Sequence, residues 1–166
     1  MTGRARRETA ARDEDRAEAA DELMLGRQFC FALYSASSMV TRLYRPLLEP
    51  LALTYPQYLA MLVLWERAPL TVGEIGSALG LDSATLTPLL KRLEATGYVS
   101  RRRDPQDERR VLVAPTESGI ALKEKALRVR EALSCSLPLP AVEIQRIHDA
   151  LRGLNEALRR TVTPES

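Results

Sequence analysis

The sequence predicts a mostly α-helical fold with one small β-hairpin, and three observations support this. Apolar residues recur with helical spacing over most of the chain after residue 20. Between about residues 98 and 114 the helical spacing gives way to two short strand-like runs around a polar turn. With 166 residues, the chain has room for one domain with extended helices but not for two full domains. We therefore expect four helices, a hairpin and two further helices, in that order.

Residues 1 to about 20 are rich in Arg, Asp, Glu and Ala and lack a sustained apolar stripe, which predicts a mobile N-terminal arm. The acidic residues and the missing apolar core argue against a secretory or organellar targeting segment. No run in the chain approaches the roughly 18 apolar residues that a membrane span needs. We therefore expect a cytoplasmic protein with no membrane partner.

The first and last helices carry more apolar surface than a small domain can cover. The first is predicted from Leu23 to about Leu48, and the last two from about 116 to 133 and 141 to 160, separated by the Leu-Pro-Leu-Pro segment at 137–140. Uncovered apolar stripes on helices favour self-association. The sequence therefore predicts a homodimer formed through helices at about 21–50 and 116–160.

Three shorter helices are expected between these terminal segments. The T-x-x-Q and T-x-x-E patterns at 54–57 and 71–74 are typical of capping boxes and predict two helix starts. Asp82 or Ser83 then caps a helix over Ala84–Ala95. The helix that starts at Thr71 and the one that follows it, joined by a tight turn containing glycine, match a helix-turn-helix.

The second helix of this pair offers short hydroxyl and basic side chains to DNA. Phosphates or base edges are the expected targets of Ser83, Thr85, Thr87, Lys91 and Arg92. Pro88 lies about one turn inside the helix, which predicts a tilted helix start. From this pair alone, two helices that merely pack in a core are an equal alternative.

The predicted hairpin, with strands at 98–103 and 109–114, carries five arginines around its tip. Arginine is attracted to narrow minor grooves, so the hairpin is a candidate DNA-binding wing. Asp107 is spaced to orient Arg109 by a bidentate hydrogen bond, and we add Arg103, Asp107 and Arg109 to the candidate DNA contacts. A charged hairpin that is simply solvated is the alternative.

The segment LDSATLTPLLKRLEATGYVSRRRDPQDERRVLVAPTESG resembles the MarR family of winged-helix regulators, with the D-x-R pattern at Asp107 and Arg109 as its most specific mark. The resemblance covers nearly everything after residue 20. It implies a winged helix-turn-helix domain over 21–166, with a DNA-binding unit at about 54–115 and interlocking terminal helices in a homodimer. The implied partner is double-stranded palindromic operator DNA, with recognition helices in major grooves about 10 base pairs apart.

Cys30 lies in the first predicted helix within the aromatic stretch FCFALY, one turn before Tyr34. In isolation, a cysteine in such a stretch is more often a small buried hydrophobe than a reactive group. Tyr44 follows 14 residues later, about 21 Å away along a helix. If the first helices of a dimer run antiparallel, Tyr44 and Tyr55 of the partner subunit reach the Cys30 sulfur and stabilise its thiolate.

This constellation is similar to the organic-hydroperoxide-responsive branch of the MarR family, in which two tyrosines of one subunit contact a reactive cysteine on the first helix of the other. The resemblance implies that Cys30 is the peroxidatic sensor, supported by Tyr44, Tyr55 and Tyr34. It also implies that Cys135 is the resolving cysteine of a two-cysteine type, pairing across subunits. An inert cysteine at a helix end is the alternative. The implied function is a repressor that organic hydroperoxide, as inducer, releases from DNA.

Two other functions compete with this hypothesis. A MarR-type repressor could be released by a small phenolic or drug-like ligand, with both cysteines incidental. A thiol peroxidase using Cys30 and Cys135 would leave the arginine hairpin unexplained, so we expect no enzyme and no catalytic residues. With two distant cysteines and one histidine, we also expect no metal site, no disulfide scaffold and no cofactor.

Overall fold

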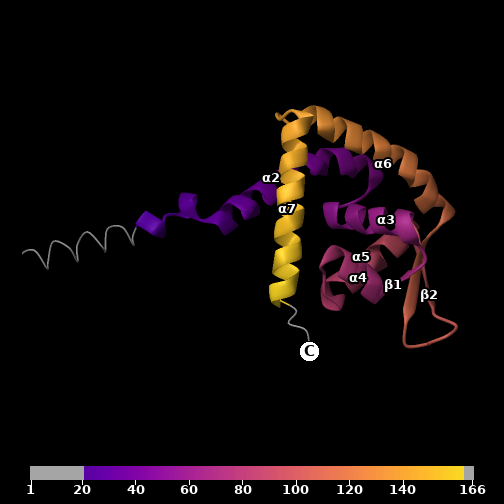
Figure 1. Ribbon diagram of the computed structural model, residues 1–166. Helices are drawn as coiled ribbons and strands as arrows, with labels where there is room; N and C mark the ends of the chain where they lie inside the picture. Colours follow the sequence, from indigo (N-terminus) through magenta and orange to yellow (C-terminus); the bar gives the residue numbers. More distant parts are fainter. Residues whose placement is uncertain (1–20, 163–166) are drawn as a thin grey trace, which may run out of the picture. The chain divides into compact units, whose positions relative to one another are not determined.

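The computed structural model describes residues 21–162 and divides into two compact units, one up to Val129 and one from Arg130 onward. The predicted N-terminal arm lies outside the described residues. The first unit holds helices and a small antiparallel sheet, which confirms the predicted mostly α fold with a hairpin (Figure 1). The hairpin projects beyond the helices of this unit (Figure 1).

Helix α2 spans Phe29–Leu48 and begins later than predicted. A short 3-10 turn, η1 (Leu25–Arg27), precedes it, and the extended backbone of Gln28 separates the two. The Gln28 side-chain amide donates to the backbone oxygens of Glu22 and Met24, so this residue fastens the preceding turn instead of continuing the helix. At its other end, α2 runs past Pro46 into the 3-10 turn η2 (Glu49–Leu51).

The predicted caps start the three middle helices: α3 (Tyr55–Arg67), α4 (Val72–Leu79) and α5 (Ser83–Ala95). The capping boxes are both present, with the Thr54 and Thr71 backbone N–H groups donating to Gln57 at 2.8 Å and Glu74 at 2.7 Å. Asp82, rather than Ser83, caps α5. These side chains satisfy backbone donors that have no partner inside the helix.

The sheet has the order β1-β3-β2, all antiparallel, and one of its strands was not predicted. This is β1 (Leu70–Thr71), which is too short to show an alternating pattern in the sequence. The hairpin strands are β2 (Val99–Arg103) and β3 (Val111–Pro115). Strand β3 begins after Arg109 and Arg110 because Arg110 N–H donates to the Asp107 carbonyl at 2.8 Å and closes a turn.

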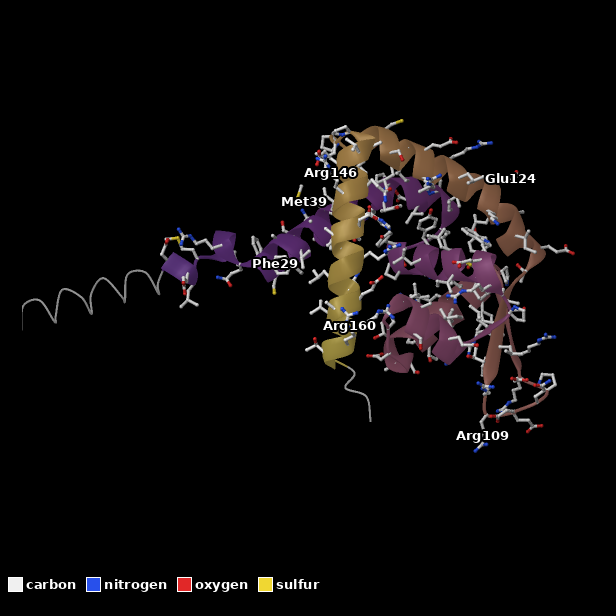
Figure 2. All side chains as sticks on the ribbon, in the orientation of Figure 1. Phe29, Met39, Arg109, Glu124, Arg146 and Arg160 are labelled. Carbon is white, nitrogen blue, oxygen red and sulfur yellow. The ribbon has the colours of Figure 1, made fainter. Side chains whose placement is uncertain are left out.

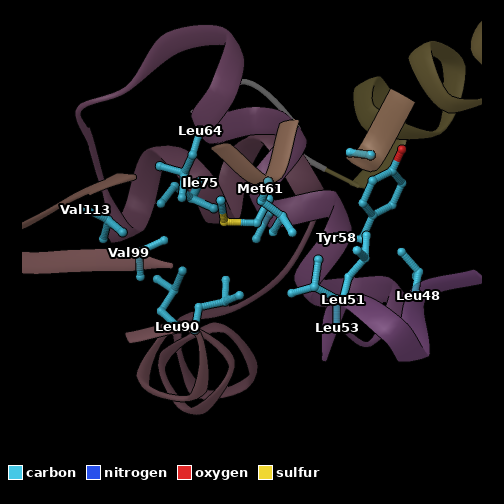
Figure 3. Packing of buried hydrophobic residues seen from close by; sticks show 14 of the residues in the cluster. Leu48, Leu51, Leu53, Tyr58, Met61, Leu64, Ile75, Leu90, Val99 and Val113 are labelled. Atoms are coloured by element: carbon cyan, nitrogen blue, oxygen red, sulfur yellow. The ribbon is translucent and has the colours of Figure 1, made fainter. Parts of the chain in front are cut away.

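The core of the first unit lies between the helices and the inner face of the sheet (Figure 3). Its fully buried side chains come from α2 to α5 and from both hairpin strands: Leu48, Met61, Leu64, Ile75, Leu86, Leu90, Leu93, Val99 and Val113. Burying each such aliphatic side chain contributes about 1.5–3 kcal/mol. This core fixes the hairpin and helices α3, α4 and α5 relative to one another.

Helix α6 (Glu117–Ser136) starts in tight contact with the beginning of β2. The Gly119 backbone lies so close to the Tyr98 carbonyl oxygen that a Cβ at position 119 would overlap it. Trp65 Nε1 donates to the Gly119 carbonyl at 2.8 Å. Glycine is therefore required where α6 leaves the sheet.

Helix α7 (Ala141–Val162) belongs to the second unit, and many of its apolar side chains are exposed there, including Val142, Ile147, Leu151 and Leu158. Among the described helices, none is long and apolar enough by itself to cross a membrane. Only a bent pair, Phe29–Leu51 with Tyr55–Arg67 at 72°, meets that test together.

Replacing Gly119 with alanine should destabilise the protein by about 1–3 kcal/mol, because the added methyl group overpacks a backbone contact. Urea unfolding followed by circular dichroism measures this. The matched control is Gly73→Ala, since a Cβ at Gly73 meets no atom within 4 Å. Equal stabilities of the two variants would contradict the packing described here.

Candidate functional site

Helix α5 presents one polar face and one buried face. Leu86, Leu90 and Leu93 are fully buried, whereas Ser83, Thr85, Lys91 and Arg92 are exposed and Thr87 is half-buried. Asp82 Oδ1 accepts the Thr85 backbone N–H at 2.7 Å, and this bond holds the pKa of Asp82 below its usual value. The predicted DNA-contacting hydroxyls therefore lie on the outer face of a well-capped helix.

The hairpin carries Arg109 at its tip, where Figure 2 shows the side chain pointing away from the rest of the first unit. The Arg109 side chain is 94% exposed. Asp107 Oδ1 accepts both its backbone N–H at 3.1 Å and its Nε at 3.3 Å. The predicted bidentate pair was therefore wrong, because a single carboxylate oxygen takes both bonds. The terminal guanidinium nitrogens have no protein partner among the described residues.

The other hairpin arginines differ in what they contact. Arg103 donates to the Glu108 carbonyl at 3.0 Å and thereby braces the loop. Arg101 turns towards α5, where it pairs with Glu94 at 3.5 Å and is only 18% exposed. Sequence reasoning placed all five arginines at the tip, but the β2–β3 register puts Arg101 opposite the buried Val113, on the inner face. Residue alternation along a strand explains this orientation.

Tyr44 and Tyr55 come together, as the proposed thiol site requires. Their ring centroids lie 4.5 Å apart, and Tyr58, which sequence reasoning missed, lies 5.7 Å from Tyr44. Burial raises the pKa of Tyr44 to about 12, with the neighbouring tyrosines adding to the effect, and burial also raises the pKa of Tyr55. Phenols are protonated at neutral pH even at their usual pKa, so both can donate hydrogen bonds, and these shifts extend that state to higher pH. The three-residue step from Tyr55 to Tyr58 on one helix face was the signal available for Tyr58.

Both cysteines are exposed in the single chain. Cys30 is the second residue of α2, and the apolar residues Phe29 and Met39 of the same helix are also exposed (Figure 2). This excludes a buried core position for Cys30 within one chain. Tyr34 lies one turn further along and is 71% exposed. Cys135 lies in the last turn of α6, because the helix extends beyond the predicted end at Leu133.

Comparison with known proteins identifies the family. A sequence model of the MarR family matches residues 53–111. The organic hydroperoxide resistance transcriptional regulator of Bacillus subtilis is 44% identical over 140 residues, covering 84% of this chain and 95% of that protein. The chain belongs to the MarR family.

Solved structures of MarR-type regulators share the fold. Reduced AbfR bound to DNA superposes with a TM-score of 0.72 at 34% identity, covering 91% of this chain and 99% of that one. A structure of AbfR with its disulfide formed gives a TM-score of 0.57 at 33% identity, covering 92% and 98% of the two chains. As a MarR-family member, this chain is a DNA-binding transcriptional regulator and not an enzyme, so the thiol peroxidase alternative is excluded.

The raised pKa of Tyr44 predicts a specific alkaline instability. Because the folded state binds this phenolic proton more tightly than the unfolded state, whose pKa is 10.0, the free energy of unfolding should fall as pH rises from 10 to about 12. Urea unfolding across this range measures the fall. Tyr44→Phe should make it shallower, whereas Tyr34→Phe, which alters an exposed ring, should not. The same slope in both variants would contradict the assignment.

Proposed function

We propose that this protein is a redox-sensing repressor that acts in the cytoplasm as a homodimer on palindromic operator DNA. An organic hydroperoxide oxidises Cys30, which then pairs with Cys135 of the partner subunit, and the repressor leaves the operator. The observation that carries this proposal is the contact between Tyr44 and Tyr55, which gathers two protonated phenols at one place on a chain whose Cys30 is exposed.

The apolar faces of the terminal helices support the homodimer. On α2, Phe29, Tyr34 and Met39 are exposed along the half of the helix that begins beside Cys30, and α7 carries a further exposed apolar row. Large apolar side chains exposed in such number on two helices favour association with another apolar surface. In a symmetric dimer the same patches face each other, so a second copy of the chain covers them. The Cys30 end of one α2 then meets the tyrosines at the opposite end of the other.

The tyrosine pair supplies the chemistry that a peroxide sensor needs. A hydrogen bond donated to a thiolate favours the charged form, and the thiolate is the nucleophile in peroxide reduction. Two donors close enough to share one target are better placed to hold that charge than one alone. Tyrosine is protonated at neutral pH at its usual pKa, and burial raises the pKa of both phenols further, so neither competes as an anion.

The proposed reaction has two steps, oxidation of Cys30 and formation of the disulfide. The Cys30 thiolate attacks the terminal peroxide oxygen, an S–O bond forms, the O–O bond breaks, and the alkoxide leaves and is protonated to the alcohol. The peroxide is reduced, and Cys30 is oxidised to sulfenic acid. The thiol of Cys135 of the partner subunit then attacks that sulfur, an S–S bond forms, and water leaves.

Formation of the disulfide moves the two subunits, and this movement releases the protein from DNA. It requires Cα atoms about 4.4–6.8 Å apart, so any greater starting separation must be closed by movement of the subunits. Two recognition helices must meet successive major grooves at a fixed spacing, and a change in their separation weakens both contacts together. The relatives fit this scheme: one is named for organic hydroperoxide resistance, and AbfR is known both reduced on DNA and with a disulfide formed.

Cumene hydroperoxide should convert the purified protein to a species of twice its 18.5 kDa chain mass on a non-reducing gel. The same treatment should release an operator duplex, selected beforehand from a random pool with reduced protein, and a dithiol should restore binding. Cys30→Ser should stay bound under peroxide. Release of the Cys30→Ser protein would refute the sensor, and crosslinking of a Cys135→Ser protein would refute the pairing.

Removal of one phenolic donor should slow the first step. Tyr44→Phe and Tyr55→Phe each delete one hydrogen bond to a charged acceptor, worth about 1.5–3 kcal/mol, part of which is offset because a more basic thiolate is more nucleophilic. We expect Cys30 oxidation at pH 7 to be about three- to tenfold slower, measured by the rate of sulfenate trapping. Unchanged oxidation rates in both folded variants would show that the two tyrosines do not assist the Cys30 thiolate.

A further inference from the structure

A cleft of about 920 Å³ lies in the first unit between α4, α5 and the hairpin. Its lining joins the two proposed DNA-reading elements, because Thr87 comes from α5 and Arg109 from the hairpin. Between them lie arginines from three different segments: Arg67 at the end of α3, Arg101 on β2, and Arg110 before β3. The cleft is therefore built by folding and is not a charged run on one element.

The charge of the cleft favours an anion. Four arginines line it, against Glu74 as its one carboxylate. Glu74 is already engaged, since Oε2 accepts both the backbone N–H of Thr71 at 2.7 Å and its hydroxyl at 2.6 Å. These bonds, with smaller contributions from Arg110 and Arg67, keep the pKa of Glu74 below its usual value. Its charge is fixed by its capping role and leaves the surrounding cations in excess.

The arginines of the cleft retain unused donors. Arg110 forms no side-chain hydrogen bond or ion pair within the described part of the chain, and Arg67 has only a distant contact with Glu66, at 3.9 Å. Arg101 is held against α5 by Glu94 at 3.5 Å, and its buried Nε has no partner there. Arg101 therefore fixes the hairpin beside α5, whereas Arg67 and Arg110 remain available to a ligand.

The geometry of DNA identifies that ligand. The sugar-phosphate strand is what separates a major groove from the adjacent minor groove, so a protein that inserts a helix in one and a hairpin in the other must straddle one strand. We propose that the cleft seats the phosphates of that strand, with Arg67 and Arg110 as phosphate contacts and Arg101 as a positioning residue for the hairpin. This rests on the proposed placement of α5 and the hairpin in neighbouring grooves.

Salt dependence tests the proposal, because each phosphate neutralised by the protein releases counterions and contributes roughly 0.9 to the slope of log affinity against log salt. With the selected operator duplex, Arg67→Gln and Arg110→Gln should each reduce the slope by roughly 0.9, and the double variant by roughly 1.8. The ranking of operator sequences should stay the same, since phosphates carry no base identity. The matched control is Arg128→Gln, an exposed arginine on α6 outside the cleft, which should keep the wild-type slope.

Slopes for Arg67→Gln and Arg110→Gln equal to that of Arg128→Gln would overturn the proposal. Binding of the free ion alone would also overturn the proposal. In that case inorganic phosphate raises the melting temperature of the wild type but not of the double variant, and both proteins have the same salt slope for DNA binding. Two further variants, Thr85→Val and Arg109→Ala, distinguish failure of the phosphate seat from failure of the proposed groove placement. If these weaken operator binding while the cleft variants do not, the phosphate seat alone is wrong; if none does, the groove placement is wrong.

Discussion

The contact between Tyr44 and Tyr55 joins the helix that carries Cys30 to the first helix of the DNA-binding unit. Tyr44 lies near the C-terminal end of α2, and Tyr55 begins α3 immediately after a capping threonine. Aromatic rings at this separation contribute about 0.5–1.5 kcal/mol beyond their burial. The same two rings that pack α2 against α3 also provide the proposed donors for the partner subunit's thiolate. Packing and the proposed redox chemistry thus use the same two side chains.

Helix α2 is suited to transmit a movement from one end to the other. Its 20 residues span about 30 Å. The Cys30 end is apolar and exposed, whereas Leu48 at the other end is fully buried in the core that also holds α3 and α5. Because packed cores do not deform continuously, we expect a displacement imposed on the cysteine end to move the DNA-binding unit. The proposed intersubunit disulfide acts on this arrangement.

Local patterns in the sequence predicted most helix starts. Contacts between residues far apart in the sequence could not be predicted from such patterns. The capping boxes at Thr54 and Thr71 are short-range patterns with one structural outcome, and both formed. Strand β1 escaped prediction because its two residues form a strand only by pairing with β3, some 40 positions away. The inward turn of Arg101 depends on the strand register, and the cleft it lines depends on three segments meeting. Tyr58 escaped because a tyrosine followed by Leu59, Ala60 and Met61 has the pattern of ordinary core.

A crystal structure of the reduced dimer tests the central claim most directly. The account requires that the hydroxyl groups of Tyr44 and Tyr55 from one subunit both lie within hydrogen-bonding distance of the Cys30 sulfur of the other, with the first helices antiparallel. A dimer in which both hydroxyls contact other groups and the Cys30 sulfur meets neither would contradict it, whatever the affinity of the protein for DNA.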